Sequence, residues 1–258
     1  MKNLIITAAI ASLFLSASFK PAAPRKQIVL MGAAVVELFT SEGCSSCPPA
    51  DEALARLAKE YAGKPVYLLS FHVDYWDKLG WKDPYSNPDY TDRQKAYAKQ
   101  LNAQAYTPQA IVNGKKELIG SQSGTLHNLI NASLKIMPEN AISVGASFQN
   151  LALTATYKLH SVDDNDLVNV ALVQDHATDR ISAGENKGAT LSHINVVRVF
   201  KTVKSKQSGE IKLDIPKDLS GKPFKLILYV QNKNDLHITA ANTMSLSPTR
   251  VITVSKSK

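Results

Sequence analysis

The chain of 258 residues contains only two cysteines, and they lie three positions apart in the stretch ELFTSEGCSSCPPAD, residues 37–51. A Cys-x-x-Cys pair can form a redox centre, supply two ligands to a metal ion, or close a loop as a disulfide. In a redox centre, one thiolate with a lowered pKa attacks and the second cysteine resolves the mixed disulfide. The surroundings of Cys44 and Cys47 must decide between these three kinds of chemistry.

The sequence around the pair gives little support to a metal site or to a purely structural disulfide. A structural zinc site generally takes four ligands, and the chain has no second Cys/His pair of suitable spacing. A disulfide between residues three apart closes so small a ring that it constrains little chain entropy. A copper site in which His72 joins the two thiolates remains open as an alternative.

The elements that must position the cysteines favour redox chemistry. The apolar run at residues 34–39 predicts a buried strand before the pair, and the prolines and acids at 48–52 predict a helix that starts directly after it. Unpaired backbone N–H groups at a helix start favour a thiolate and lower its pKa. We therefore predict that Cys44 is the nucleophile and that Cys47 resolves the mixed disulfide.

The rest of the chain divides into two halves of different periodicity. Over residues 33–138 we expect a second strand (66–73), two helices (91–101 and 125–137), and a hairpin turning at Asn113-Gly114. From residue 141 onwards, apolar residues alternate with period two, which is typical of an antiparallel sandwich. The sequence thus predicts an α/β domain at 33–138 followed by an all-β, antiparallel, sandwich-like domain at 139–258.

Several side chains are further candidates. Glu37 lies inside the first strand, where a buried carboxylate could take the proton from Cys47, although a structural glutamate fits equally well. Glu42 is an alternative in the loop, which we expect to be exposed. His72, Asp74 and Trp76, in the segment FHVDYWD, leave the second strand towards the cysteines and are candidates for a substrate groove or for loop packing. We interpret His193 as structural.

Three segments together resemble one family: ELFTSEGCSSCPPADE, SFHVDYWDKLGWKDPYSNPDYTDRQKAY and YTPQAIVNG are similar to exported bacterial proteins of unknown function with a thioredoxin-like domain. GENKGATLSHINVVR, at 184–198, resembles the C-terminal half of that family. The resemblance implies a thioredoxin-like fold for residues 33–138 and thiol–disulfide chemistry. It also implies that Thr107-Pro108 is the cis-proline that faces the cysteines and leaves backbone groups free for a substrate. Ser45-Ser46 departs from the Gly-Pro of thioredoxin, so the resemblance does not imply that this protein is a reductant as thioredoxin is.

The N-terminal residues and the net charge limit where the protein can be located and which partners it can bind. Residues 1–18 predict a cleaved signal peptide and hence a periplasmic or secreted protein. The formal net charge is +8, but the lysines are scattered, so we expect no nucleic acid as partner and no membrane after signal cleavage. We predict an exported thiol–disulfide oxidoreductase without cofactor, acting on a protein or small-thiol disulfide with an unknown redox partner. The alternatives are a non-catalytic thioredoxin-fold binding module and a copper-binding carrier.

Overall fold

The computed structural model of the protein describes residues 32–149 and 152–246, so the predicted signal peptide lies outside the described residues. The first half of the described chain contains these elements in order: β1 (Ala34–Thr40), α1 (Pro48–Glu60), β2 (Val66–His72), α2 (Pro88–Gln100), β3 (Gln109–Val112), β4 (Lys116–Ile119) and α3 (Ser123–Leu134). The second half contains β5 (Ile142–Gln149), β6 (Ala152–Leu159), β7 (Asp166–Arg180), β8 (Thr190–Lys204), β9 (Ser208–Asp214), β10 (Phe224–Asn232) and β11 (Ile238–Leu246).

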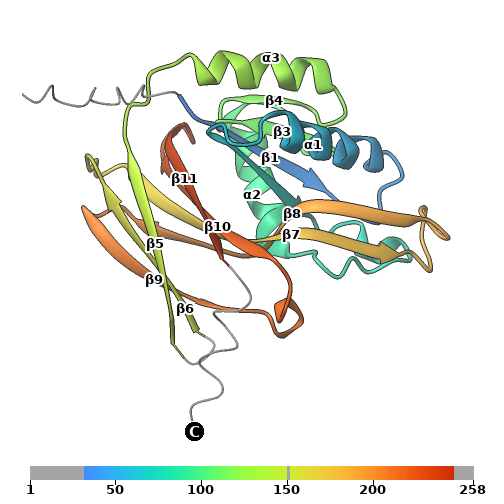
Figure 1. The fold of residues 1–258 in the computed structure, drawn as a ribbon. Coiled ribbons are helices and arrows are strands. Elements are labelled where there is room, and N and C mark those ends of the chain that lie inside the picture. The colour runs from blue at the N-terminus through green and yellow to red at the C-terminus, as the bar shows by residue number, and fades with distance from the viewer. Residues whose placement is uncertain (1–31, 150–151, 247–258) are drawn as a thin grey trace, which may run out of the picture.

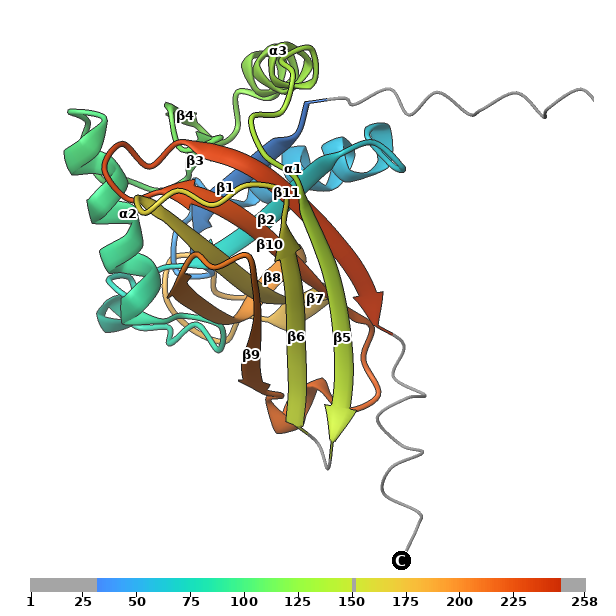
Figure 2. The same ribbon diagram turned by 90° about the vertical axis from the view of Figure 1, so that its left-hand side faces the viewer.

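One mixed sheet of eight strands runs through both halves, in the order β11-β10-β7-β8-β2-β1-β3-β4. Strands β1 and β2 are parallel, and β3 and β4 continue the sheet antiparallel. The halves join where β2 meets β8 in parallel, with Ser70 opposite Val196 as the one registered pair. A second sheet, β5-β6-β9, packs as a separate layer beside the C-terminal strands of the first (Figures 1 and 2).

The predicted fold class, an α/β thioredoxin-like domain followed by a separate all-β sandwich-like domain, is wrong. The described chain is mostly β, with three α-helices, and its main sheet takes four strands from each half. Sequence periodicity identifies strands but not their partners, and here the decisive pairing joins residues 126 positions apart, Ser70 and Val196. A period-two strand pattern does begin after Pro138. The division into domains at 33–138 and 139–258 stays a prediction.

Three apolar clusters hold the layers together. One lies between the helices α1 and α3 and the face of β1–β4 that carries Val36, Leu38 and Leu68. The opposite face of β1 and β2, with Phe39 and Phe71, packs on residues of β7, β8 and β10. The third cluster fills the space between the two sheets. Because the second cluster draws on both halves, it forms a core that neither half completes alone.

The individual elements around the cysteines follow the local sequence closely. Helix α1 begins with two prolines after Cys47, which stands at the N-cap position. The side chain of Asn87 caps α2 by accepting the N–H of Asp89. Asn113 and Gly114 have φ values of 47° and 70°, as the turn of a tight hairpin between β3 and β4 requires.

Candidate functional site

Cys44 and Cys47 form a disulfide in the loop between β1 and α1. Their Cα atoms are 5.4 Å apart. The N–H of Cys47 donates to the carbonyl of Cys44, and the Cys47 carbonyl accepts the first helical bonds, from Ala50 and Asp51. Both cysteines are buried, with exposed fractions of 0% and 1%. The predicted strand–disulfide–helix junction is therefore present, but the sulfur atoms are covered.

The Thr107–Pro108 peptide lies next to the pair and is cis, as the family resemblance implied. The Ser46 hydroxyl lies 3.3 Å from Cys44 Sγ and donates to the Thr107 carbonyl over 3.5 Å. The indole Nε1 of Trp76 donates to the Thr107 hydroxyl at 2.8 Å. Three predicted site residues, Thr107, Pro108 and Trp76, thus lie beside the cysteine loop.

The tip of the β7–β8 hairpin, residues 181–189, which we call the hairpin tip, binds the cysteine loop. Asn186 Nδ2 donates to the carbonyls of Glu42 and Cys44, at 2.8 and 3.0 Å. The Ser45 N–H donates to Glu185 Oε2 at 3.1 Å, and the hydroxyl of Ser45 together with this N–H holds the pKa of the Glu185 carboxyl below its usual range. In Figure 1 this hairpin extends past the C-terminal edge of β1. A segment from the second half is therefore hydrogen-bonded to the cysteine loop of the first half.

Beside the cysteine loop lie five acidic and basic side chains that we call the buried acid–base cluster: Glu42, Asp51, His72, Asp83 and His193. None of them is more than 5% exposed. They come from the cysteine loop, α1, β2, the segment after β2, and β8. The cluster therefore draws together groups that are far apart in the sequence.

Two ion-pair systems make up this cluster. His72 Nδ1 lies 2.7 Å from Asp83 Oδ2, and the same carboxylate accepts the backbone N–H of Glu42 at 2.8 Å. His193 lies between two carboxylates, with Nε2 3.4 Å from Glu42 Oε1 and Nδ1 3.5 Å from Asp51 Oδ2. The two imidazole rings meet edge to face at a centroid distance of 4.8 Å. The two systems are therefore in direct contact.

The electrostatics of the cluster favour charge on His193. Burial by itself would lower the pKa of His193, but the carboxylates of Asp51 and Glu42 outweigh burial and raise it to about 10. Burial likewise would raise the pKa of Asp83, yet His72 and the N–H donors of Glu42 and Tyr85 hold it below its usual range. At neutral pH, His193 is therefore a buried cation and Asp83 a buried anion.

Two predicted site residues lie in other contacts. Glu37 is fully buried, and its carboxylate receives two bonds from Arg93, at 2.6 and 2.8 Å, and others from Tyr97 and Tyr229. Asp74 accepts the hydroxyl of Thr91 in α2 at 2.5 Å. The described contacts of Glu37 and Asp74 do not include the cysteines, and their predicted roles stay predictions. His72 belongs to the buried acid–base cluster.

Sequence reasoning did not place Asp51, Asp83 or Asn186 beside the cysteines. It interpreted His193 as structural, and that interpretation stays a prediction. It also placed Glu42 in an exposed loop, whereas Glu42 is fully buried and accepts the Trp81 indole N–H at 2.8 Å. One signal was available, because His193 alternates with Leu191 on the buried face of a strand. A histidine in such a position needs a polar partner.

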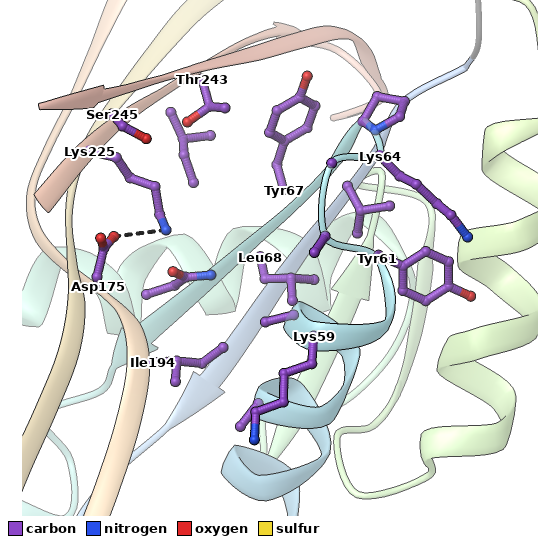
Figure 3. A pocket seen from close by; sticks show the side chains of 18 of the residues that line it. Lys59, Tyr61, Lys64, Tyr67, Leu68, Asp175, Ile194, Lys225, Thr243 and Ser245 are labelled. Atoms are coloured by element: carbon purple, nitrogen blue, oxygen red, sulfur yellow. Dashed lines mark ion pairs between the residues drawn. The ribbon is translucent and has the colours of Figure 1, made fainter.

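A larger cavity, of about 870 Å³, lies at the other end of α1. Figure 3 shows it between this helix, β2 and the strands β10 and β11, with the Lys225–Asp175 ion pair (2.8 Å) on one wall. Ala58, Leu68 and Ile194 give it an apolar lining. Ala55, the first α1 residue that lines it, lies eight positions after Cys47, roughly 12 Å along the helix axis, so the cavity is a separate feature.

Within residues 32–149 and 152–246, no three or more His, Cys, Asp or Glu side chains are arranged to hold a metal ion. No helix in that same part of the chain has the length and apolar character needed to cross a membrane.

Comparison with known proteins places the chain in a family. The chain is similar to a crystal structure of a protein from Agrobacterium tumefaciens, with 27% identity and a TM-score of 0.59, over 83% of this chain and 94% of that one. A β-glucuronidase from Ruminococcus gnavus (8% identity, TM-score 0.25, 43% of this chain and 16% of that one) and the chicken interferon gamma receptor alpha chain (10%, 0.28, 54% and 58%) are too distant to support an argument. No curated protein matches the chain. A family model described as "Protein of unknown function (DUF1223)" matches residues 35–231, and the chain therefore belongs to this family.

Proposed function

We propose that the protein is a thiol–disulfide oxidoreductase with Cys44 and Cys47 as its redox pair. The observation that carries this proposal is the disulfide at the first turn of α1, with Cys47 at the N-cap. Backbone N–H groups at a helix start stabilise a thiolate, which makes a cysteine there a better leaving group and a stronger acid. Export, predicted from residues 1–18, would place the pair where disulfides persist.

The chemistry is a two-step exchange. A substrate thiolate attacks Cys44 Sγ, the Cys44–Cys47 bond breaks, and its electron pair leaves on Cys47 Sγ, which takes up a proton. A second substrate thiolate then attacks the substrate sulfur of the mixed disulfide and releases Cys44 as a thiolate. The substrate dithiol is oxidised to a disulfide and the protein pair is reduced; the reverse sequence oxidises the protein and reduces a disulfide.

Burial of both sulfur atoms sets a condition on this reaction. With exposed fractions of 0% and 1%, neither sulfur can be attacked in line until a covering segment moves. The hairpin tip is the segment bound to the cysteine loop through Asn186 and Glu185. The proposal therefore includes an open form in which the hairpin tip leaves the loop.

The test is the reduction potential of the pair together with trapping of the intermediate. We expect equilibration with glutathione in the range of known redox proteins, roughly −270 to −120 mV, and a Cys47→Ser variant that accumulates a mixed disulfide on Cys44. The Cys44→Ser variant is the matched control, and it should trap less. A potential below about −300 mV with no trapped adduct would identify a structural disulfide and refute the proposal.

The cavity of Figure 3 favours a second candidate, a non-catalytic binding module. Its volume of about 870 Å³ and apolar lining suit a small molecule. Under this alternative, the Cys44→Ser/Cys47→Ser double variant would keep its function, whereas Ala58→Trp, which fills the cavity, would abolish it. Under the first proposal the two variants have the opposite effects.

A further inference from the structure

We propose that the buried acid–base cluster is a proton relay for the disulfide, in which His193 and Asp51 exchange a proton with Cys47. This inference rests on the proposed redox function and deepens it. It assigns an acid–base role to two residues that lie on different elements from the substrate side at Thr107-Pro108. Electrons would then reach the pair from one side, and the proton from another.

The first argument is that cleavage of this disulfide creates a charge in a buried place. When the bond breaks, Cys47 leaves as a thiolate at a position that is 1% exposed. A thiolate without water or a partner is costly to hold there, so a proton must arrive with the electron pair. A protein group close to Cys47 can supply that proton at the moment the bond breaks.

The second argument is the position of Asp51. It lies four residues after Cys47, one helical turn into α1, so both side chains project from the same face of the helix. Asp51 Oδ2 accepts the Thr40 hydroxyl at 3.3 Å and lies 3.5 Å from His193 Nδ1. Asp51 therefore contacts the buried imidazolium from the same helix turn that Cys47 begins.

The third argument is the number of unpaired polar atoms. Among the described residues, five buried atoms of the cluster make no hydrogen bond: Glu42 Oε1, Asp51 Oδ1, His72 Nε2, and His193 Nδ1 and Nε2. Both His193 nitrogens and Glu42 Oε1 have ion-pair partners at 3.4–3.5 Å, so Asp51 Oδ1 and His72 Nε2 are the two atoms with neither kind of partner. Each buried polar atom without a hydrogen bond costs stability, and most proteins avoid such atoms. Concentrated at one place beside a reactive group, they indicate a site where protons are taken up and released.

The structure also contains a route by which His193 can regain its proton. A cavity of about 230 Å³ is lined by Pro48, Asp51 and Glu52 of α1 and by residues 190–193 of β8, including His193. It is large enough for several water molecules. After His193 gives up its proton, water in this cavity can return one without opening the hairpin tip.

The balanced step is as follows. A substrate thiolate forms a bond to Cys44 Sγ, and the electron pair of the Cys44–Cys47 bond goes to Cys47 Sγ. The imidazolium of His193 donates its proton to the Asp51 carboxylate, which passes it to Cys47 Sγ. His193 is left neutral and recovers a proton from water. The second substrate thiolate then bonds to the substrate sulfur of the mixed disulfide, and the electron pair of the broken bond to Cys44 leaves on Cys44 Sγ.

Other titratable and charged groups around His193 affect the pH dependence of disulfide reduction. They come from every element packed against it: Glu42 on the cysteine loop, Asp51 and Glu52 on α1, His72 on β2, Asp83 and Tyr85 after β2, Asp179 on β7, and Arg198 on β8. Asp83 is committed to His72, and Asp179 accepts the hydroxyl of Tyr85 at 2.6 Å. Glu42 and Asp51 are the groups that lie at ion-pair distance from His193 itself.

The test is the rate of disulfide reduction by dithiothreitol in the full-length protein, expressed per dithiothreitol thiolate, as a function of pH. In the wild type, we expect this rate constant to fall as the pH rises towards the pKa of His193. His193→Gln and Asp51→Asn should lower it at neutral pH by about 10²-fold, the usual size of general-acid catalysis, and flatten the profile. His160→Gln, at an exposed position, is the matched control and should behave as wild type.

Two outcomes would overturn the relay. One is a flat profile in the wild type, a measurement that does not depend on the folding of any variant. The other is an unchanged rate and profile in folded His193→Gln and Asp51→Asn, as judged by circular dichroism. Failure of the redox function is a different result, namely a pair too stable to exchange with glutathione, and it leaves this pH profile measurable.

Discussion

The hairpin tip makes access to the disulfide a testable property, and Asn186→Ala is the sharpest perturbation. This change removes two hydrogen bonds, to the carbonyls of Glu42 and Cys44, at 2.8 and 3.0 Å. A hydrogen bond between neutral groups contributes about 0.5–1.5 kcal/mol net, so the closed form should lose about 1–3 kcal/mol relative to the open form. If opening precedes attack, reduction should accelerate by about 5- to 150-fold.

The assay is reduction by excess dithiothreitol, followed by the fluorescence of Trp76 and Trp81, which contact Thr107 and Glu42 beside the disulfide. Lys187→Ala is the control on the same hairpin tip, because the Lys187 side chain is exposed and makes no hydrogen bond or ion pair with the described residues. We expect the equilibrium constant with glutathione to change much less than the rate, because the two lost hydrogen bonds are made to backbone carbonyls and not to the sulfur atoms. A rate for Asn186→Ala equal to that of Lys187→Ala would refute the view that this tip controls access.

Three further predictions follow from the same contacts. Gly184 has φ +73°, and a Cβ there would lie 3.1 Å from Trp81 Cβ, so Gly184→Ala should loosen the hairpin tip and speed reduction; an unchanged rate would contradict this. The pKa of His193, raised from 6.5 to about 10, implies stabilisation that is complete below pH 6.5 and lost as the pH rises towards 10. Urea unfolding at pH 6 and pH 9.5 should therefore show a larger fall in the free energy of unfolding for wild type than for His193→Gln, at roughly 1.4 kcal/mol per pKa unit, and equal falls would speak against the ion pairs. Glu37→Gln should cost about 3–5 kcal/mol in urea unfolding because Arg93 is left buried without its carboxylate. Its disulfide should still be reduced at the wild-type rate, and a tenfold slower reaction in the folded variant would instead support the proton role first considered for Glu37.

The elements around the cysteines could be predicted from the sequence because local signals specify them. The prolines after Cys47 begin α1 and Asn113-Gly114 turns the β3–β4 hairpin, each by an effect that acts within a few residues. The position of Thr107-Pro108 beside the cysteines came from resemblance instead.

The rest of the site depends on strand pairing, which local patterns do not encode. His193 reaches the cluster because β8 lies next to β2, and Asn186 reaches Cys44 because β7 and β8 are long enough to carry their turn over α1. Alternation showed that β8 has a buried face, but not what that face is buried against. Reading the chain as two separate domains therefore removed His193 and Asn186 from consideration.

The long β7–β8 hairpin makes the reactivity of the cysteines a joint property of the two halves. The first half supplies the sulfur atoms, the helix start and the Thr107-Pro108 peptide. The second half supplies the cover through Asn186 and the imidazole of His193. A fragment limited to residues 33–138 would keep the Cys-x-x-Cys motif yet present an open and differently charged disulfide. Selection can therefore change the reactivity of the disulfide through the contacts between the two halves. Substitutions in strands that contain no cysteine can alter how readily, and at what pH, the disulfide reacts.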